Sequence, residues 1–144
     1  VKHWVLKGQY MGVPQTRHRV FFIALRTDIF KGFDLQSLDM SFNYEPITYG
    51  EMTNGECDVR TGKMHDIAAQ SIKGECLLSQ TLMRLEKKYS LFTHRVIDEE
   101  DIVPTILAGH RDIWRRDGNG ISKGDMISAQ TFPQDETVPH DNEH

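Results

Sequence analysis

The apolar run at residues 19–25, Arg-Val-Phe-Phe-Ile-Ala-Leu, constrains the fold of this chain more than any other segment. β-Branched and aromatic residues dominate it, and no polar residue interrupts it after Arg19. A half-buried strand would alternate apolar and polar residues, whereas a strand buried on both faces reads as a continuous apolar run. We therefore predict a strand buried on both faces, as in the sheets of α/β proteins. Residues 4–6 predict the end of a short strand before it, and residues 8–12 predict a turn.

Three polar side chains lead into this strand at every second position, namely Gln15, Arg17 and Arg19. In an extended backbone they fall on one face, roughly 6.6 Å apart, because each residue advances the chain by about 3.3 Å. Arginine offers planar, multiple donors that suit phosphates and base oxygens. The row is therefore a candidate nucleotide-binding surface. The alternative for an Arg-x-Arg pair is a solvated strand start paired with carboxylates.

The middle of the chain carries one clear helical pattern. From residue 27 to about residue 74, glycines and a proline punctuate short mixed stretches, which predicts irregular loops and short strands. Leu78, Leu82, Leu85 and Tyr89 then recur at helical spacing. Two lysines in the last turn, at positions 87 and 88, complement the helix dipole. We predict a helix over residues 78–89.

Three elements are predicted beyond that helix. Residues 103–108 read as an edge strand, because Pro104 cannot donate a ladder hydrogen bond. Residues 109–120 read as an exposed loop. Ser122, with Asp125 three positions later, predicts a capping box that opens a short helix through residue 129, and a proline at position 133 prevents its continuation.

Charge is distributed unevenly along the 144 residues. The net charge of −4 argues against wholesale electrostatic capture of nucleic acid, since sequence-independent DNA affinity comes from Lys and Arg that neutralise phosphates. The acidic excess lies at residues 98–101 and in the tail from residue 135. A local basic stretch remains in the predicted loop, where Arg111, Arg115 and Arg116 could each contact DNA or be solvated.

The remaining composition is that of an ordinary soluble domain, with 38% hydrophobic and 26% charged residues. No apolar run is long enough to span a bilayer, and the start at Val1 has neither an initiator Met nor a signal-peptide pattern. We expect an excised segment of a cytoplasmic protein from a bacterial or phage-type host. Cys57 and Cys76 are expected to be free thiols, and no metal is expected, because the histidines at 140 and 144 lie in a polar tail.

Three segments carry a resemblance to one family. Residues 10–24, Tyr-Met-Gly-Val-Pro-Gln-Thr-Arg-His-Arg-Val-Phe-Phe-Ile-Ala, resemble the Gly-Val-Pro-Gln-x-Arg-x-Arg-Val motif of DNA (cytosine-5) methyltransferases. Residues 104–106, Pro-Thr-Ile, resemble a Thr-Ile or Thr-Leu step inside the target-recognition region of that family. Residues 129–135, Ala-Gln-Thr-Phe-Pro-Gln-Asp, resemble the Gln-x-Phe-Pro-x-Asp element that closes the region.

The resemblance implies a role on duplex DNA. Enzymes of this kind flip the target cytosine out of the helix and transfer a methyl group from S-adenosylmethionine to its C5 atom. Arg19 is then expected to donate to the O2 region of the flipped cytosine, with Arg17 beside the same nucleotide and its phosphate, and Gln15 in the same row. Thr105 falls near a recognition loop, or is equally a sheet residue. Restriction–modification is one role such DNA methylation could serve.

The chemical machinery of that family is missing from this sequence. Neither cysteine follows a proline, no Glu-Asn-Val run occurs, and no glycine-rich turn follows a strand in a way that would open a cofactor site. We therefore expect this chain to supply recognition and one side of the base pocket, while the remainder of the catalytic domain supplies the nucleophile and S-adenosylmethionine. A stand-alone, non-catalytic DNA-binding module is the alternative, and an interaction domain without nucleic acid is a third.

The expected architecture is mixed α+β. Residues 1–26 are expected to form the edge of a Rossmann-like methyltransferase sheet. Residues 27–121 are expected to form a target-recognition domain of short strands and a helix, in which residues 33–74 have no assigned contacts. Residues 122–144 are expected to form a C-terminal helix that returns toward the sheet, the Phe-Pro element and a polar tail.

Overall fold

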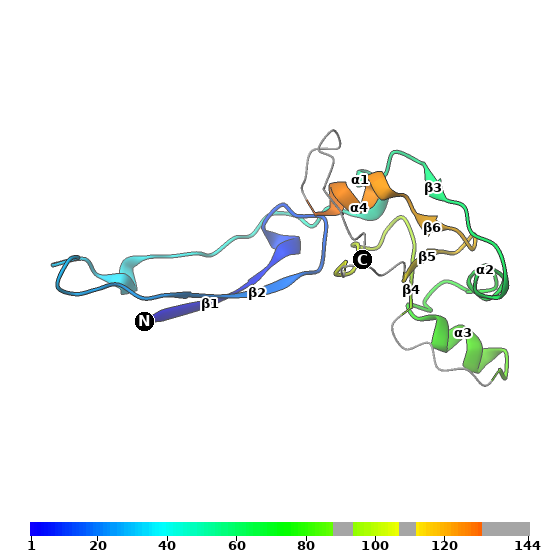
Figure 1. Ribbon diagram of the computed structural model, residues 1–144, viewed down its shortest axis with the longest axis horizontal. Helices are drawn as coiled ribbons and strands as arrows, with labels where there is room; N and C mark the ends of the chain where they lie inside the picture. The colour runs from blue at the N-terminus through cyan, green and yellow to red at the C-terminus, as the bar shows by residue number, and fades with distance from the viewer. Residues whose placement is uncertain (88–93, 107–111, 131–144) are drawn as a thin grey trace, which may run out of the picture.

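The computed structural model describes residues 1–87, 94–106 and 112–130 (Figure 1). Within them the fold is mixed α+β, as predicted, with a two-stranded sheet, a four-stranded sheet and four α-helices. We refer to three parts. The hairpin is residues 2–23, the strap is residues 24–48, and the body is the described part of residues 49–130. None of the described helices is both long and apolar enough to cross a membrane.

The hairpin consists of β1 (Lys2–Lys7), a 3-10 turn η1 (Gly8–Tyr10) and β2 (His18–Ile23). The two strands are antiparallel, in a register that runs from Lys2 opposite Ile23 to Lys7 opposite His18. The predicted strands and the turn at residues 8–12 are confirmed. Opposite residues in such a pair share one face of the sheet, so each face of the hairpin can be read from this register.

The prediction that β2 is buried on both faces is wrong for the described structure. Val20 is 52% exposed and Phe22 is 71% exposed, although both belong to the apolar run. Their neighbours on that face of β1, His3 and Val5, are exposed too, and the His3 ring lies 5.9 Å from the Phe22 ring. The physical reason is that a sheet of two strands has little to cover it, and only the opposite face receives other residues of this chain.

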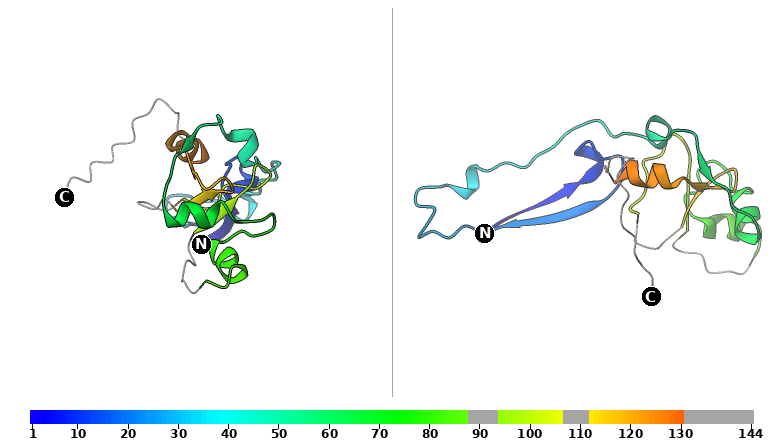
Figure 2. Two further views of the ribbon diagram at one scale, coloured as in Figure 1. Left: turned by 90° about the vertical axis from the view of Figure 1, so that its right-hand side faces the viewer. Right: turned by 45° about the horizontal axis from the view of Figure 1, so that its top comes forward.

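The strap lies against β1 on the opposite face of the hairpin, where Phe21 of β2 stays 41% exposed. After β2 the chain turns, forms a short 3-10 helix η2 (Leu35–Ser37), and returns along the hairpin toward the body (Figures 1 and 2). The Lys2 ammonium donates to the carbonyls of Gln36 and Leu38 at 2.9 and 2.7 Å. Near the turn, the backbone N–H of Tyr44 donates to the carbonyl of Tyr10 at 3.0 Å. The predicted boundary after residue 26 therefore lies at the start of the strap. The first α-helix begins at residue 49.

The body is built on a small mixed sheet of four strands in the order β3-β6-β5-β4. These strands are β3 (Cys57–Asp58), β4 (Arg95–Ile97), β5 (Ile113–Arg115) and β6 (Gly120–Ile121). β4 and β5 run parallel, whereas β6 is antiparallel to both of its neighbours. Each strand is short, so most of the stability of the body must come from the helices that cover it.

Two helices cover each face of this sheet (Figure 1). On one face, Val96 and Trp114 pack with α2 (Lys63–Ala68) and α3 (Leu78–Arg84). On the other face, Ile97 and Ile113 pack with α1 (Tyr49–Met52) and α4 (Lys123–Ala129). The alternation of side chains along a strand explains why neighbours such as Val96 and Ile97 enter different cores. The buried members of the two cores are Ile67, Ala68, Leu78, Leu82, Val96 and Trp114, and Tyr49, Ile97, Val103, Ile113, Ile121 and Ala129.

The helix predictions were partly correct. α4 begins after Ser122, whose hydroxyl accepts from the Asp125 N–H at 2.9 Å, so the predicted capping box and the end at Ala129 are confirmed. α4 packs against α1 inside the body. α3 is shorter than predicted and ends at Arg84, because Glu86 adopts a left-handed backbone with φ of 54°. The predicted end of that helix, at residues 88 and 89, lies outside the described residues.

Two predicted elements are corrected by the structure. No strand forms over the described residues 102–106, where Val103 makes only an isolated bridge to Gln15. The described part of the predicted loop, residues 112–120, is instead a β-hairpin made of β5, a tight turn and β6. Ile113 and Trp114 are buried in it. Whether these two segments form strands depends on pairing with residues far away in the sequence, and the local composition does not reveal that pairing.

Candidate functional site

The turn between β1 and β2 folds tightly around Gly8. The backbone N–H of Gly8 donates to the carbonyl of Arg17 at 2.8 Å, and the N–H of Val13 donates to the carbonyl of Gly8 at 3.2 Å. A Cβ atom on Gly8 would lie 2.9 Å from the carbonyl oxygen of Gln15 and 3.1 Å from that of Arg17. Only glycine therefore fits, and this packing holds the segment that carries the arginines against β1.

Gln15 lies at the joint between the hairpin and the body. It forms a parallel bridge with Val103, and the next residue, Thr16, donates its N–H to the Val103 carbonyl at 2.9 Å. The Gln15 side chain is 1% exposed, and its Nε2 atom has no hydrogen-bond partner in the described structure. A buried N–H donor without a hydrogen-bond partner lowers the free energy of unfolding by about 1–3 kcal/mol. Gln15 is therefore placed to hold the joint and not to contact an external nucleotide.

Arg17 and Arg19 remain on one face of the hairpin. Arg19 pairs with Leu6, and the ladder continues to Arg17 through the Gly8 N–H, so alternation places both arginines on the face that carries Leu6. Neither guanidinium has a hydrogen bond or ion pair with the described residues. Two arginines with free donors, two positions apart on a backbone fixed by the turn, form a site that can accept an anionic or carbonyl-bearing group.

Thr105 is brought to the same place from a distant part of the sequence. It is exposed, and its Oγ1 lies 3.5 Å from the carbonyl of Thr16, between Gln15 and Arg17. The contact is long for a hydrogen bond, but it places Thr105 beside the arginine segment. The segment of Gln15 and Arg17 therefore meets Thr105 at the joint, and Arg19 lies two positions further along β2.

The remaining predicted site residues lie elsewhere. Arg115 and Arg116 are at the turn between β5 and β6, at the end of the body away from the hairpin (Figures 1 and 2). Arg111 lies outside the described residues, as do residues 131–135 of the Phe-Pro element. The structure therefore separates the described predicted site arginines into two groups, Arg17 and Arg19 in the hairpin and its turn, and Arg115 and Arg116 at the far end of the body.

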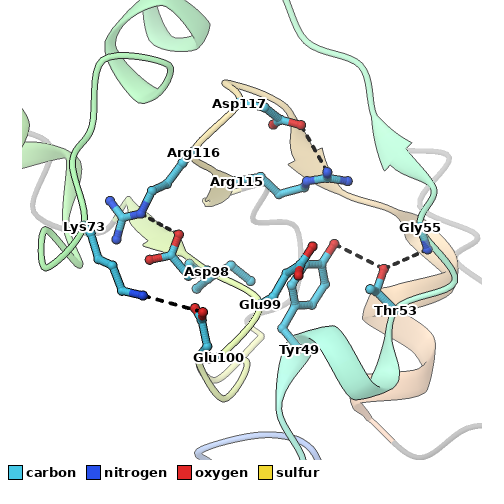
Figure 3. A pocket seen from close by; sticks show the side chains of 11 residues that line it. Tyr49, Thr53, Gly55, Lys73, Asp98, Glu99, Glu100, Arg115, Arg116 and Asp117 are labelled. Carbon is cyan, nitrogen blue, oxygen red and sulfur yellow. Dashed lines mark hydrogen bonds and ion pairs between the residues drawn. The ribbon is translucent and has the colours of Figure 1, made fainter.

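A cavity of about 450 Å³ lies beside the β5–β6 turn (Figure 3). Its floor includes Tyr49 and Ile97 from one core of the body. Three cations and four carboxylates surround it, so the lining is slightly acidic. The cavity does not favour phosphate. No contiguous sequence pattern indicates it, because its residues come from four separate segments. The lining residues are Tyr49, Thr53, Gly55, Lys73, Ile97, Asp98, Glu99, Glu100, Arg115, Arg116 and Asp117.

The two arginines of this cavity are used within the chain. Arg116 donates from Nε to Asp98 at 2.5 Å, and its two terminal nitrogens donate to the carbonyls of Ile72 and Glu75. Arg115 pairs with Asp117 at 3.2 Å (Figure 3). Arg116 therefore anchors the connection between α2 and α3, whereas Arg115, in a partly exposed pair, could be released at small cost.

Two buried polar groups support the walls of this region. The phenol of Tyr49 donates to Asp125 at 3.1 Å, and burial raises the pKa of that phenol. Glu75 accepts from Arg84 at 2.7 Å and from Thr81 at 2.8 Å. The bond from Arg84 is the main reason that the pKa of Glu75 falls from 4.5 to about 2. Tyr49 lines the cavity with its phenol already bound to Asp125, whereas Glu75 is not among the lining residues.

Two observations on the described residues bear on a cofactor turn and on a metal. The segment Gly118-Asn119-Gly120 follows β5 but leads into another strand, whereas a cofactor-binding turn opens a helix. A Cβ atom on Gly118 would lie 2.7 Å from the His65 ring, so this glycine serves packing. In the part of the chain that the structure describes, no group of three His, Cys, Asp or Glu side chains could hold a metal ion.

Comparison with known proteins finds no matching family model, no similar curated protein and no similar solved structure.

Proposed function

We propose that this chain is the target-recognition region and one side of the base pocket of a DNA cytosine-5 methyltransferase. One observation carries the proposal. The Gln-x-Arg-x-Arg segment and the Thr105 segment, which resemble that family at two places in the sequence, meet at one joint through Gln15, Val103 and Thr16. If the resemblance were due to chance, two segments 89 positions apart in the sequence would not be expected to lie in contact.

The free arginines suit the chemistry of this reaction. Addition of a thiolate to the cytosine ring pushes negative charge toward N3 and O2, and fixed donors stabilise that charge as it develops. Arg19, exposed and without an internal partner, would donate to the O2 region, and Arg17 to the phosphate of the same nucleotide. Gln15 acts through position, because its buried side chain fixes the segment against Val103.

The hairpin suits the edge of a larger, Rossmann-like sheet. β1 and β2 pair only with each other among the described strands, so each has an unpaired outer edge. The face that carries Val5, Val20 and Phe22 is apolar and uncovered. A neighbouring strand and a covering helix from the remainder of the catalytic domain would bury both features. That remainder would hold S-adenosylmethionine and the nucleophile, because the Pro-Cys and Glu-Asn-Val motifs do not occur in this sequence.

The test is methyl transfer by the full-length protein that contains this chain. Tritium transfer from labelled S-adenosylmethionine to duplex DNA should fall by about 100-fold or more in Arg19→Ala, in the range seen when one charge-stabilising donor is lost. Arg26→Ala is the matched control, because Arg26 is an exposed arginine that pairs only with its neighbour Asp28. The 144-residue chain alone should give background counts.

A stand-alone DNA-binding module is the second candidate, favoured by a body that has two closed cores of its own. The coding sequence directly upstream discriminates between the two. Pro-Cys and Glu-Asn-Val motifs in frame support the enzyme, whereas a start codon next to Val1 supports the module. Full activity in Arg19→Ala would contradict the enzyme proposal in either case.

A further inference from the structure

A second cavity, of about 360 Å³, lies between β1 and the returning strap. Three aromatic residues, two methionines and two charged residues are among those that line it. The lining residues are Trp4, Val5, Leu6, Lys7, Tyr10, Met11, Asp39, Met40, Ser41 and Phe42. Tyr10 and Met11 open the segment that carries the resemblance, but the proposed pocket for the target cytosine uses none of these residues.

One ring of the wall, that of Trp4, is restrained by a neighbouring cation. The Lys2 ammonium, fixed by the carbonyls of Gln36 and Leu38, lies 4.9 Å from the centre of the Trp4 ring. A cation over the ring restrains its orientation. The backbone of Tyr10 is tied to the strap, because its carbonyl accepts from the Tyr44 N–H. Aromatic rings at a cavity favour a flat ring that can stack on them.

The polar groups of this cavity select among flat rings. Asp39 is oriented by the Ser41 hydroxyl, which donates to one carboxylate oxygen at 2.6 Å. The other oxygen has no partner in the described structure, so it can accept from an amine of a ligand. A carboxylate recognises the exocyclic amino group of a base such as cytosine. Thymine has no such group.

The cavity follows β1, and its lining residues Trp4 and Leu6 lie on the face that carries the arginines, whereas Val5 and Lys7 lie on the other face. Leu6, which lines it, is the register partner of Arg19, and Trp4 lies two positions further along that face. Lys7 also lines the cavity. A base in the aromatic cavity would therefore have cationic side chains nearby for its phosphate.

From these features we propose that the aromatic cavity binds an unpaired, amino-bearing nucleobase of the DNA strand. Trp4, Tyr10 and Phe42 stack on the base, Asp39 accepts from its amine, and Lys7 contacts its phosphate. The inference rests on the proposed function in taking DNA as the ligand. It adds a second base site, distinct from the position of the cytosine that is methylated.

The test uses fluorescence of Trp4 in the full chain with Trp114→Phe, which leaves one tryptophan. A single-stranded oligo-dC should quench Trp4 emission and bind at least fivefold more tightly than oligo-dT. Duplex DNA of the same length should not quench it, because its bases are paired. The mononucleotide dCMP should quench weakly at high concentration, which distinguishes the base from the polymer backbone. Anisotropy of a labelled oligo-dC with the unmodified chain gives the same comparison if Trp114→Phe unfolds the body.

Variants locate the effect. Phe42→Ala should weaken oligo-dC binding about tenfold, a typical loss for one stacked aromatic ring. Phe33→Ala is the matched control, because Phe33 is a similarly exposed phenylalanine of the strap that does not line the cavity. Asp39→Ala should remove the preference for dC over dT. Equal effects of Phe42→Ala and Phe33→Ala, or quenching by dT and duplex as strong as by dC, would overturn the inference.

The two proposals fail separately. Quenching of Trp4 by oligo-dC with unchanged methyl transfer in Arg19→Ala would reject the enzyme proposal and keep the base site. Loss of methyl transfer in Arg19→Ala without any quenching of Trp4 would keep the enzyme proposal and reject the base site.

Discussion

The hairpin and the body differ in where their side chains find partners. In the body, apolar residues fill two cores, and arginines such as Arg84 and Arg116 are bound by carboxylates and carbonyls of the same chain. In the hairpin, Val20 and Phe22 face outward, and Arg17 and Arg19 have no such partner among the described residues. The apolar residues of the body are therefore buried within this chain, whereas one face of the hairpin needs another chain or domain to cover it.

The largest expected effect concerns Asp125, a fully buried carboxylate that joins α1 to α4. It accepts from the hydroxyls of Tyr49 and Thr53, both at 3.1 Å. Asp125→Ala should lower the free energy of unfolding of the body by about 3–5 kcal/mol, because several buried donors lose their acceptor. Near-ultraviolet circular dichroism during urea unfolding measures this change in a Trp4→Phe background, which leaves Trp114, and a Trp114→Phe background isolates Trp4 for the comparison below.

The matched control is Asp66→Ala, which removes a carboxylate whose side chain is 70% exposed. It should change the same free energy by less than about 0.5 kcal/mol. Trp4 fluorescence should stay near its native value at the urea concentration that unfolds the Asp125→Ala body. If Trp4 and Trp114 instead report one common unfolding transition, the hairpin and the body unfold together, and the hairpin depends on the body for its stability.

The next effect contrasts one apolar residue from each part. Leu82→Ala removes a side chain that is 1% exposed and should destabilise the body by about 2–5 kcal/mol. Phe22→Ala removes a larger side chain that is 71% exposed and should change stability by less than about 1 kcal/mol. Urea midpoints of the two variants give the comparison. A loss in Phe22→Ala as large as in Leu82→Ala would show that the outward face of the hairpin is covered within this chain.

A third prediction separates the two groups of arginines. Arg17→Gln should reduce the slope of log DNA affinity against log salt by about 0.9, as expected for one lost phosphate contact. Arg116→Gln should leave that slope unchanged and should instead destabilise the body by about 1–3 kcal/mol, because three internal acceptors lose their donor. Anisotropy titrations over a range of salt concentrations, with urea unfolding in parallel, measure both. Identical salt slopes for the unmodified chain and Arg17→Gln would argue against a phosphate contact.

The smallest expected effect is the pH dependence contributed by Glu75. Its pKa is lowered by the hydrogen bond from Arg84, so the ionised form is favoured in the folded state. The resulting stability is fully present above pH 4.5 and is lost as the pH falls toward 2. Solvent screening limits the contribution to about 1 kcal/mol. Glu75→Gln should flatten this part of the stability curve. An unchanged acid slope would show that other carboxylates determine it.

Local signals in the sequence predicted part of the fold. The strand at β2, the turn before it and the capping box of α4 depend on neighbouring residues, and all three were predicted. The end of α3 was missed because Glu86 takes a left-handed conformation that is usual for glycine and unusual for glutamate. The β5–β6 hairpin was missed because its buried face is defined by β4 and α3, which lie outside the segment.

The candidate site was predictable only in its local part. The even spacing of Gln15, Arg17 and Arg19 is visible in the sequence, but the burial of Gln15 is not, because it depends on Val103. Arg116 reads as a free cation in the sequence, whereas in the structure Asp98 and two carbonyls bind it. The aromatic cavity joins β1 to the strap, so no contiguous motif could have indicated it.

The unpaired outer edge of β2 has a consequence for the making of this protein. A strand edge with open N–H and C=O groups is a template for any second strand, including that of another newly made copy. Residues 20–23 contain no proline and no charge that would discourage such stacking. The yield of non-aggregated protein should therefore depend on how soon after synthesis that edge is covered. A high concentration of newly made copies should favour aggregates that pair through this strand.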